Sequence, residues 1–392
     1  MASHKIRILH TADLHLGTNF SSFPDREVRD ILRGEQSNIL LELTRVVKAE
    51  KIDLVLIAGD LFDRPDLDQQ IVNRVKNNLA NLDCKVHICA GNHDPYIEGS
   101  FWATEWPDNV HIVPHTEVES YYYEDLGILV DSVSFSDIYS INSLFTAAPQ
   151  TDVPVDTLKL LMLHGDFGIE DRKSSYNPIP ISSVKAQGYD YLALGHIHLA
   201  QEGNLGFRDA QYAYPGAPQG RGFDELGQGH FLVGTFTRDS GLGRYNQEWK
   251  KHLLNTRPFL IHEINISDVE NEHEIQQAIE EDLIQWQKTK EFDLKRAILR
   301  LVLVGSPDLK FNISLGHLQE YIKSLDYFYV EIEDKTKVPL ELDRWSKHSG
   351  FGQILVQEYE EQKEKALPEE KERVDRALDL ILRAHERTIN ET

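Results

Sequence analysis

The chain has 392 residues, of which 41% are hydrophobic and 9% aromatic, a composition that excludes an intrinsically disordered protein and allows two or three domains. Its formal net charge of −23 argues against a domain that grips nucleic acid through a strongly basic surface, so a phosphate-rich substrate would need bound cations, a local basic patch or a partner. Only Cys84 and Cys89 are available for disulfides, so no disulfide framework is expected. No apolar run reaches the ~20 residues of a membrane span, and the start lacks a signal-peptide stretch. We therefore expect a cytoplasmic protein with no membrane partner.

Residues 1–236 repeat one design, in which a short apolar run ends in polar residues. The clearest runs are KIRILHTADLH, IDLVLIAGDLFD, KVHICAGNHD, LKLLMLHGDF and YDYLALGHIH. Between the first three lie two helical stripes, formed by Ile39, Leu43, Val46 and Val47 and by Ile71, Val75, Leu79 and Leu82. Strands that alternate with helices predict an α/β domain whose site lies beyond the strand ends.

Four further strand patterns lack long helices between them. They are NVHIVP, LGILVDSVSF, AQYAYPGAP and GHFLVGTF, and the stretch YPGAPQGRGFDELGQG is typical of a loop. The domain therefore has either one mixed sheet or two sheets.

The character of the chain changes near Asn255–Pro258, so we place the first domain at 1–254. FLIHEINI, RAILRLVLVG and YFYVEIED predict strands, and the stretches Asp268–Trp286 and LGHLQEYIKSL predict helices between them, which indicates a small α+β domain at 255–345. The remaining 346–392 predict a helical tail. From Pro368 its apolar stripe is formed by Val374, Ala377, Leu378 and Ile381. Packing within the chain is favoured for this stripe, and docking of a partner stays open.

Polar side chains that can bind metals follow five of the predicted strands. In chain order they are Asp13 and His15 in D-x-H, Asp60 in G-D, Asn92, His93 and Asp94 in G-N-H-D, His164 in H-G, and His196 and His198 in G-H-x-H. Taken singly, each cluster could be a turn, a helix cap or a buried histidine. In an extended segment the two residues of H-x-H would face the same side. Five such clusters in one α/β domain favour a common site.

The residue types of this set indicate the chemistry. Imidazole, carboxylate and amide groups together favour Mn²⁺, Fe²⁺ or Zn²⁺ over Ca²⁺, and the absence of cysteine ligands argues against a structural zinc site. Seven candidate ligands exceed the need of one ion, whereas two ions about 3.5–4 Å apart that share a carboxylate would use them all. Such a pair activates water and stabilises charge on a phosphoryl group, which predicts phosphoester hydrolysis.

The motifs D-x-H, G-D, G-N-H-D, H-G and G-H-x-H, in this order, resemble the signature of the calcineurin-like metallophosphoesterases over residues 5 to about 236. The opening ILHTADLHLG, with AGDLFD and GNHDP, more closely resembles the SbcD/Mre11 nuclease branch. The length and YPGAPQGRGF resemble the bacterial YhaO-type DNA repair exonucleases of that branch. The resemblance implies a four-layer α-β-β-α sandwich with a smaller α+β C-terminal capping domain.

The same resemblance implies a role for each candidate residue. One ion would be bound by Asp13, His15, Asp60 and His198, and the other by Asp60, Asn92, His164 and His196, with Asp60 as the bridge and Mn²⁺ as the expected metal. His93 would not bind metal but would stabilise the transition state and protonate the leaving oxygen. Asp94 would either orient His93 or cap the following turn, and both remain open.

Two further residues have no clear assignment. Archaeal and eukaryotic Mre11 proteins have a histidine where this chain has Asp63, which leaves the handling of the substrate open. The loop Gln219–Gly222 contains Arg221, which could reach a substrate phosphate because its guanidinium suits that geometry. A surface arginine in a turn is the alternative.

The functional expectation from the resemblance is a DNA exonuclease that acts in DNA repair with a Rad50/SbcC-like ABC ATPase, and that can form a homodimer. In that family the ATPase supplies much of the grip on DNA, which fits an acidic chain. A phosphodiesterase for cyclic nucleotides shares every ligand, although the SbcD-like opening and about 140 residues after the catalytic domain count against it. A non-catalytic scaffold would typically lose ligands or His93, and all are present here.

Overall fold

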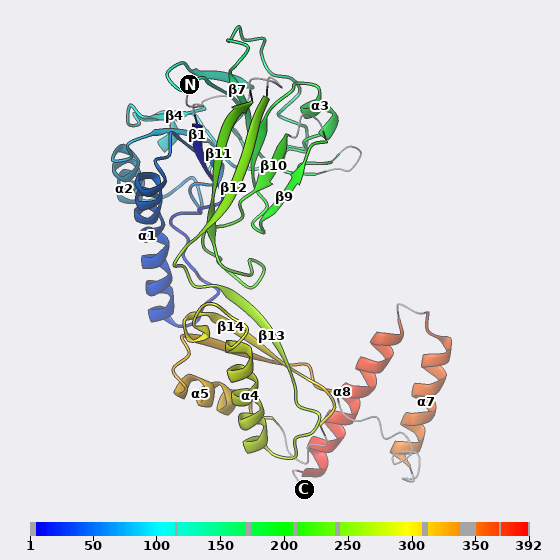
Figure 1. The fold of residues 1–392 in the computed structure, drawn as a ribbon. Helices are drawn as coiled ribbons and strands as arrows, with labels where there is room; N and C mark the ends of the chain where they lie inside the picture. The colour runs from blue at the N-terminus through cyan, green and yellow to red at the C-terminus, as the bar shows by residue number, and fades with distance from the viewer. Residues whose placement is uncertain are drawn as a thin grey trace. The chain divides into compact units, whose positions relative to one another are not determined.

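The computed structural model describes residues 5–113, 117–169, 174–206, 210–239, 244–307, 313–337, 350–367 and 370–390. The chain divides into two compact units, residues 1–259 and 260–392 (Figure 1). Residues 255–259 stay with the first unit, where the Thr256 hydroxyl donates to the Pro218 carbonyl and Phe259 packs on Phe23. The boundary predicted between residues 345 and 346 lies outside the described residues. Among those residues, no helix combines the length and the apolar character needed to cross a membrane.

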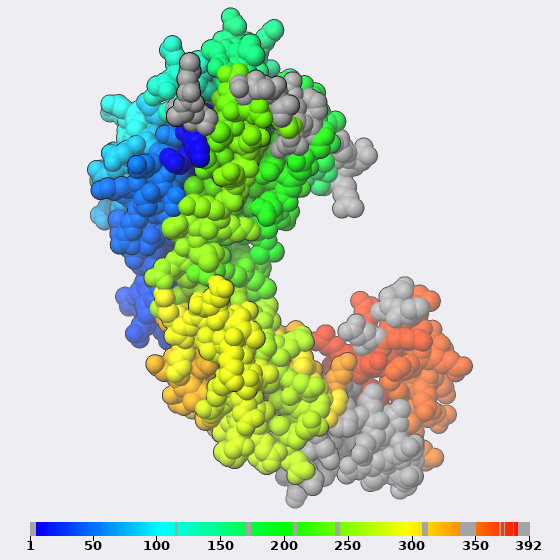
Figure 2. Space-filling view, in the orientation of Figure 1, coloured from blue at the N-terminus to red at the C-terminus, as the bar shows by residue number. Residues whose placement is uncertain are grey.

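The first unit contains a six-stranded sheet in the order β12-β11-β1-β2-β3-β4. Its strands are β1 (Lys5–Thr11), β2 (Leu54–Ala58), β3 (Lys85–Cys89), β4 (Val110–Ile112), β11 (His230–Asp239) and β12 (Arg244–Leu253). The four N-terminal strands are parallel, and β11 pairs antiparallel with β1. Residues from the two ends of this unit are therefore neighbours, and Figure 2 shows the blue start of the chain beside the green strands of 230–253.

A second six-stranded sheet follows the order β5-β6-β7-β8-β10-β9. Its strands are β5 (Glu119–Tyr123), β6 (Ile128–Ser132), β7 (Leu158–His164), β8 (Tyr191–Gly195), β9 (Gln201–Asn204) and β10 (Gln211–Tyr214). Strands β6, β7, β8 and β10 are parallel, and the edge strands β5 and β9 are antiparallel to their neighbours. Of the two alternatives left open by the sequence, the first unit has two sheets, and both are mixed.

The two sheets and their covers form the predicted four-layer α-β-β-α sandwich. Helices α1 (Arg26–Glu50) and α2 (Gln69–Ala80) cover the outer face of the first sheet, where Leu43 and Leu79 join its buried residues. A second core lies between the sheets and includes Leu56 and Met162. The outer face of the second sheet is covered mainly by loops, together with the short helix α3 (Ile181–Lys185).

The second unit has the predicted α+β arrangement. Its elements are β13 (Phe259–Asn265), α4 (Glu272–Gln287), β14 (Ile298–Val304), α5 (Leu315–Ser324) and β15 (Tyr329–Asp334), with the sheet order β13-β14-β15. Helices α7 (Phe351–Lys365) and α8 (Lys371–Asn390) follow. They pack together through Tyr359, Leu378 and Leu382, so the predicted stripe of the tail contacts α7 in part, while Ile381 remains 41% exposed.

Candidate metal centre

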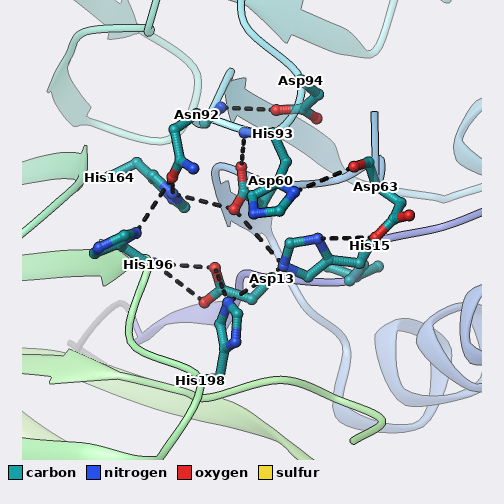
Figure 3. Close-up of polar contacts among 12 residues, drawn as sticks. Asp13, His15, Asp60, Asp63, Asn92, His93, Asp94, His164, His196 and His198 are labelled. Atoms are coloured by element: carbon teal, nitrogen blue, oxygen red, sulfur yellow. Dashed lines mark hydrogen bonds and ion pairs between the residues drawn. The ribbon is translucent and has the colours of Figure 1, made fainter. Parts of the chain in front are cut away.

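The polar residues at the carboxyl ends of β1, β2 and β3 in the first sheet, and of β7 and β8 in the second, converge on one place (Figure 3). Four of them have left-handed backbone torsions, with φ of 53° at Asp13, 44° at His15, 50° at Asp60 and 102° at His196. Such torsions are costly for residues with side chains and persist where the surroundings hold them. Here the Asp13 amide donates to the Gly59 carbonyl at 3.1 Å and the His15 amide to the Asp60 carbonyl at 3.0 Å.

These torsions change one sequence expectation. Strand β8 ends at Gly195, so His196 and His198 do not lie in the extended segment that their i, i+2 spacing suggested. Both side chains still reach the site, because the left-handed turn at His196 redirects the chain rather than because strand residues alternate. The His196 amide donates to both carboxylate oxygens of Asp13, at 3.0 and 3.2 Å, which holds this turn in place.

Glycine is required beside two of the site residues. A Cβ on Gly59, where φ is 88°, would lie 2.2 Å from Nδ1 of His164. A Cβ on Gly91 would lie 2.1 Å from Oδ1 of Asp60. The glycines of G-D and G-N-H-D therefore leave room for a carboxylate and an imidazole that come from other strands.

One group of donors consists of Asp13, His15, Asp60 and His198, whose ligand atoms all lie within 4.8 Å of one another. The Nε2 atom of His15 lies 3.6 Å from Oδ2 of Asp60 and 3.3 Å from Nε2 of His198. The Nε2 atom of His198 lies 3.8 Å from Oδ1 of Asp13. This group combines two imidazoles with two carboxylates, a set that suits a divalent transition metal.

A second group shares Asp60 and adds Asn92, His164 and His196. The Nε2 atom of His164 lies 3.3 Å from Oδ2 of Asp60 and 3.0 Å from Oδ1 of Asn92. The Nδ1 atom of His196 lies 3.2 Å from the same amide oxygen. The structure thus brings all seven candidate ligand residues together, and Asp60 lies beside members of both groups.

The Oδ2 atom of Asp60 provides a test of whether these residues fit metal ions. It is buried, it has no hydrogen-bond partner, and it lies between imidazoles of the two groups. The other oxygen, Oδ1, accepts a hydrogen bond from the His93 amide at 2.9 Å. A buried carboxylate is costly unless positive charge compensates it, and the nearest groups to Oδ2 are the imidazoles of His15 and His164. The donor set therefore fits a pair of ions that share Asp60.

The outward nitrogens of three imidazoles contact oxygen atoms, which orients the rings. Nδ1 of His164 donates to the Ala58 carbonyl at 2.9 Å, and Nδ1 of His198 donates to the Glu225 carboxylate at 2.7 Å. Nε2 of His196 lies 3.5 Å from the Asp166 carboxylate. These contacts favour the tautomers in which the opposite nitrogen carries a lone pair toward the centre.

Burial and neighbouring charges set the pKa values of the site. Burial lowers the pKa of His15 well below its usual value, and burial together with the nearby His164 lowers the pKa of His196 to about 3. Burial also acts to lower the pKa of His164, but the Asp60 carboxylate outweighs it and raises that pKa to about 9. His15 and His196 are therefore neutral, as metal ligation requires. Metal binding at His164 would release its proton.

The two predicted catalytic residues differ in their surroundings. His93 is exposed, and its Nδ1 donates to the Asp63 carbonyl at 3.2 Å. Asp94 is fully buried, and its carboxylate accepts from the amides of Gly91 at 2.8 Å and Phe62 at 2.9 Å. No contact joins Asp94 to the His93 ring in the described part of the chain. These bonds favour an anchoring role for Asp94 over orientation of His93, which the Asp63 carbonyl performs instead.

Glu225 and Asp166 contact the site but were not among the sequence candidates. Glu225 is buried and accepts from both His198 and Arg221. Asp166 directly follows His164 and Gly165, so the motif H-G-D could have indicated it. Glu225 lies in a glycine-rich loop that gives no such signal.

Arg221 and Asp63 belong to the same network around the metal centre. Besides its bonds to Glu225, Arg221 lies 3.4 Å from Oδ1 of Asp63. That carboxylate oxygen also lies 3.6 Å from Nδ1 of His15. The guanidinium therefore contacts two carboxylates that lie beside the candidate ligands His15 and His198, which favours a positioning role for Arg221 over direct contact with a substrate phosphate.

Replacing Glu225 with alanine is expected to weaken metal binding about 10- to 100-fold, the usual effect of losing a partner that orients a ligand. Glutamine keeps an acceptor for His198 and should have a smaller effect. Calorimetric titration of the metal-free protein with Mn²⁺ measures the affinity, and Glu248→Ala, an exposed change on β12, serves as the control. Unaltered affinity in Glu225→Ala would show that this carboxylate only orders its own loop.

Comparison with known proteins shows which families and chains this sequence resembles. Residues 6–200 match the calcineurin-like phosphoesterase family. The metallophosphoesterase YhaO of Bacillus subtilis, described as uncharacterized, is 26% identical over 354 residues, which are 86% of this chain and 81% of YhaO. The SbcD chain of the nuclease SbcCD is 24% identical in Staphylococcus epidermidis, over 56% of this chain and 66% of that protein. In Bacillus subtilis it is 27% identical, over 57% of this chain and 64% of that protein.

Among solved structures, similarity extends to a dimetal phosphatase from Danio rerio, with 10% identity and a TM-score of 0.37 over 63% of this chain and 98% of that one. It also extends to Vps29 of Entamoeba histolytica in complex with Zn²⁺, with 12% identity and a TM-score of 0.28 over 63% of this chain and 99% of that one.

Proposed function

Because the chain carries a calcineurin-like metallophosphoesterase domain over residues 6–200, we propose that it is a two-metal phosphodiesterase that degrades DNA as an exonuclease in DNA repair. Hydrolysis of phosphoesters is the chemistry of that family, and the buried Oδ2 of Asp60, which lies between imidazoles of the two donor groups, supports it. The DNA substrate rests on the similarity to the SbcD chains of SbcCD nucleases, which extends over more than half of the chain.

In this proposal Asp13, His15, Asp60 and His198 hold one ion, and Asp60, Asn92, His164 and His196 hold the other. Mn²⁺ is the proposed metal, with Fe²⁺ or Zn²⁺ as alternatives, because mixed imidazole and carboxylate donors suit all three. When bound, such a pair lowers the pKa of a water molecule and stabilises negative charge on a phosphoryl group.

His93 is the proposed general acid. Its ring is exposed to incoming substrate, and the Asp63 carbonyl holds Nδ1 so that Nε2 can face a leaving oxygen. For this step the ring carries a proton on each nitrogen. Nδ1 keeps its bond to the Asp63 carbonyl, and Nε2 gives its proton to the leaving oxygen as the bond between phosphorus and that oxygen breaks. Asp60 supports this geometry directly, because its Oδ1 accepts from the His93 amide.

The proposal includes a partner. The relatives of 24–27% identity are components of a two-part nuclease, SbcCD, so a Rad50/SbcC-like ABC ATPase is the proposed partner, and a homodimer is the proposed assembly. A net charge of −23 fits a nuclease component that leaves most of the grip on DNA to another protein.

The full chain with Mn²⁺ is expected to degrade linear DNA with a kcat/KM at least about tenfold above that for cyclic AMP, because a polymer offers binding energy beyond the reacting phosphate. Release of nucleotides from end-labelled and end-blocked DNA is measured beside hydrolysis of cyclic AMP under the same conditions, with chelated protein as the control. A preference for cyclic AMP would replace the proposal with a cyclic nucleotide phosphodiesterase.

A further inference from the structure

A cavity of about 400 Å³ opens between α1, α2 and the loops that follow β1 and β2. This volume lies within the usual range for sites of small ligands. Its lining includes Arg33 from α1, Arg64 from the loop after β2 and Arg74 from α2, and no aspartate or glutamate is among the described residues that line it. In a chain with 64 acidic and 41 basic residues, a lining with three arginines and no carboxylate is an unusual local concentration of positive charge.

The arginines differ in how far nearby carboxylates neutralise them. Arg33 forms an ion pair with Asp30 on its own helix, and Arg64 pairs with the highly exposed Asp66 at 3.0 Å. Arg74 is exposed and donates to the Ser37 hydroxyl at 3.3 Å. No carboxylate pairs with it in the described part of the chain. Its guanidinium therefore retains donors for an anion, and the exposed pairs of the other two are weak enough to rearrange.

The loops of this cavity are continuous with those of the metal centre. Leu16, a lining residue, directly follows His15, and Arg64 directly follows Asp63, whose carbonyl holds His93. A strand whose reacting phosphate lies at the metal centre would carry its next phosphates to nearby surfaces. A cyclic nucleotide has one phosphate and cannot occupy both places at once.

We propose that this arginine-lined cavity binds a non-reacting phosphate of the polynucleotide strand that is cut at the metal centre. The proposal rests on the proposed function and deepens it, because it names a polymer rather than a small phosphodiester as the substrate. The buried side chains of Leu16, Leu40 and Val75 form an apolar floor, against which the sugar and base of the same nucleotide can pack.

The test measures binding of a fluorescein-labelled single-stranded DNA 12-mer to the full chain in EDTA, by fluorescence anisotropy over a series of salt concentrations. Arg74→Gln is expected to weaken binding about threefold to tenfold and to reduce the slope of log Kd against log salt by roughly 0.7, the value for one lost contact to a single-strand phosphate. Arg74→Lys keeps the charge and should restore most of that slope. Arg45→Gln, an exposed arginine of α1 outside the cavity, should match the unmodified chain.

Equal slopes for Arg74→Gln and Arg45→Gln would overturn the proposal, provided that circular dichroism shows both variants to be folded. Inorganic phosphate is added as a competitor in a second arm. Complete displacement of the 12-mer by low millimolar phosphate from the unmodified chain, but not from Arg74→Gln, would assign the cavity to free phosphate and also overturn it. Failure of the chain to cut DNA with Mn²⁺ would instead contradict the proposed function, whatever the slopes.

Discussion

Replacing Asp60 with alanine should remove both metal ions and lower phosphodiesterase activity by about 1,000-fold or more, because its carboxylate is the only donor that the two groups share. Without Oδ2, each group loses a charged ligand, and two sets of imidazoles face one another with less negative charge between them. Metal content after dialysis, measured by mass spectrometry, and hydrolysis of bis-p-nitrophenyl phosphate with Mn²⁺ check the expectation.

Asp13→Ala is the matched comparison, since Asp13 belongs to one group alone. That variant should keep about one ion per chain, while Asp60→Ala keeps none. Asp60→Asn retains Oδ1, which accepts from the His93 amide, and so separates loss of charge from loss of the loop geometry. An Asp60→Ala protein that is folded and still retains one tightly bound ion would contradict the bridging role.

Most of the fold could be predicted from the sequence because its buried elements have strong patterns. The stripes of α1 and α2 and the apolar runs of β2 and β8 are buried on the faces that they predict. The edge strands β9 and β12 were not predicted. The residues of β9, QEGN, are polar and largely exposed, and in β12, RYNQEWKKHL, only Tyr245 and Trp249 pack against the core, so the apolar pattern is weak.

The sequence could predict that the candidate site residues lie together but not their geometry. Polar clusters after strands indicated the candidate ligands, because parallel strands carry their loops to a common edge. The left-handed torsion of His196 depends on its hydrogen bonds to Asp13, which come from a distant segment. The role of Asp94 depends on the amides of Gly91 and Phe62, which no local pattern specifies.

The arginine-lined cavity could not be predicted from the sequence either, because its residues come from separate segments. Arg33, Arg64 and Arg74 are separate in the sequence, and each alone is an ordinary surface arginine. Packing of α2 beside α1 brings them to one opening, and that packing follows from buried apolar residues of the two helices, such as Leu40 and Val75. An acidic chain can therefore hold a local basic site that its net charge does not reveal.

Replacing His93 with alanine should lower the turnover of DNA by about 100- to 10,000-fold while both metal ions remain bound, because this is the usual contribution of a positioned general acid. His93 is exposed and belongs to neither donor group of the proposed metal pair. The alternative to a general acid is that His93 binds metal, since its ring nitrogen lies within 4.8 Å of possible ligand atoms of His15 and Asp63. Mass spectrometry of His93→Ala therefore accompanies the kinetics, and His252→Ala on β12 is the control.

Two substrates with different leaving groups can distinguish a general acid from a residue that only orders the site. The sugar oxygen released from DNA is strongly basic and needs a proton as its bond to phosphorus breaks, whereas p-nitrophenolate leaves readily without one. His93→Ala should therefore lose at least about tenfold more activity on DNA than on bis-p-nitrophenyl phosphate. Equal losses on the two substrates would assign His93 to orientation or binding, and loss of metal would place it among the ligands, with His15 and Asp63 as its neighbours.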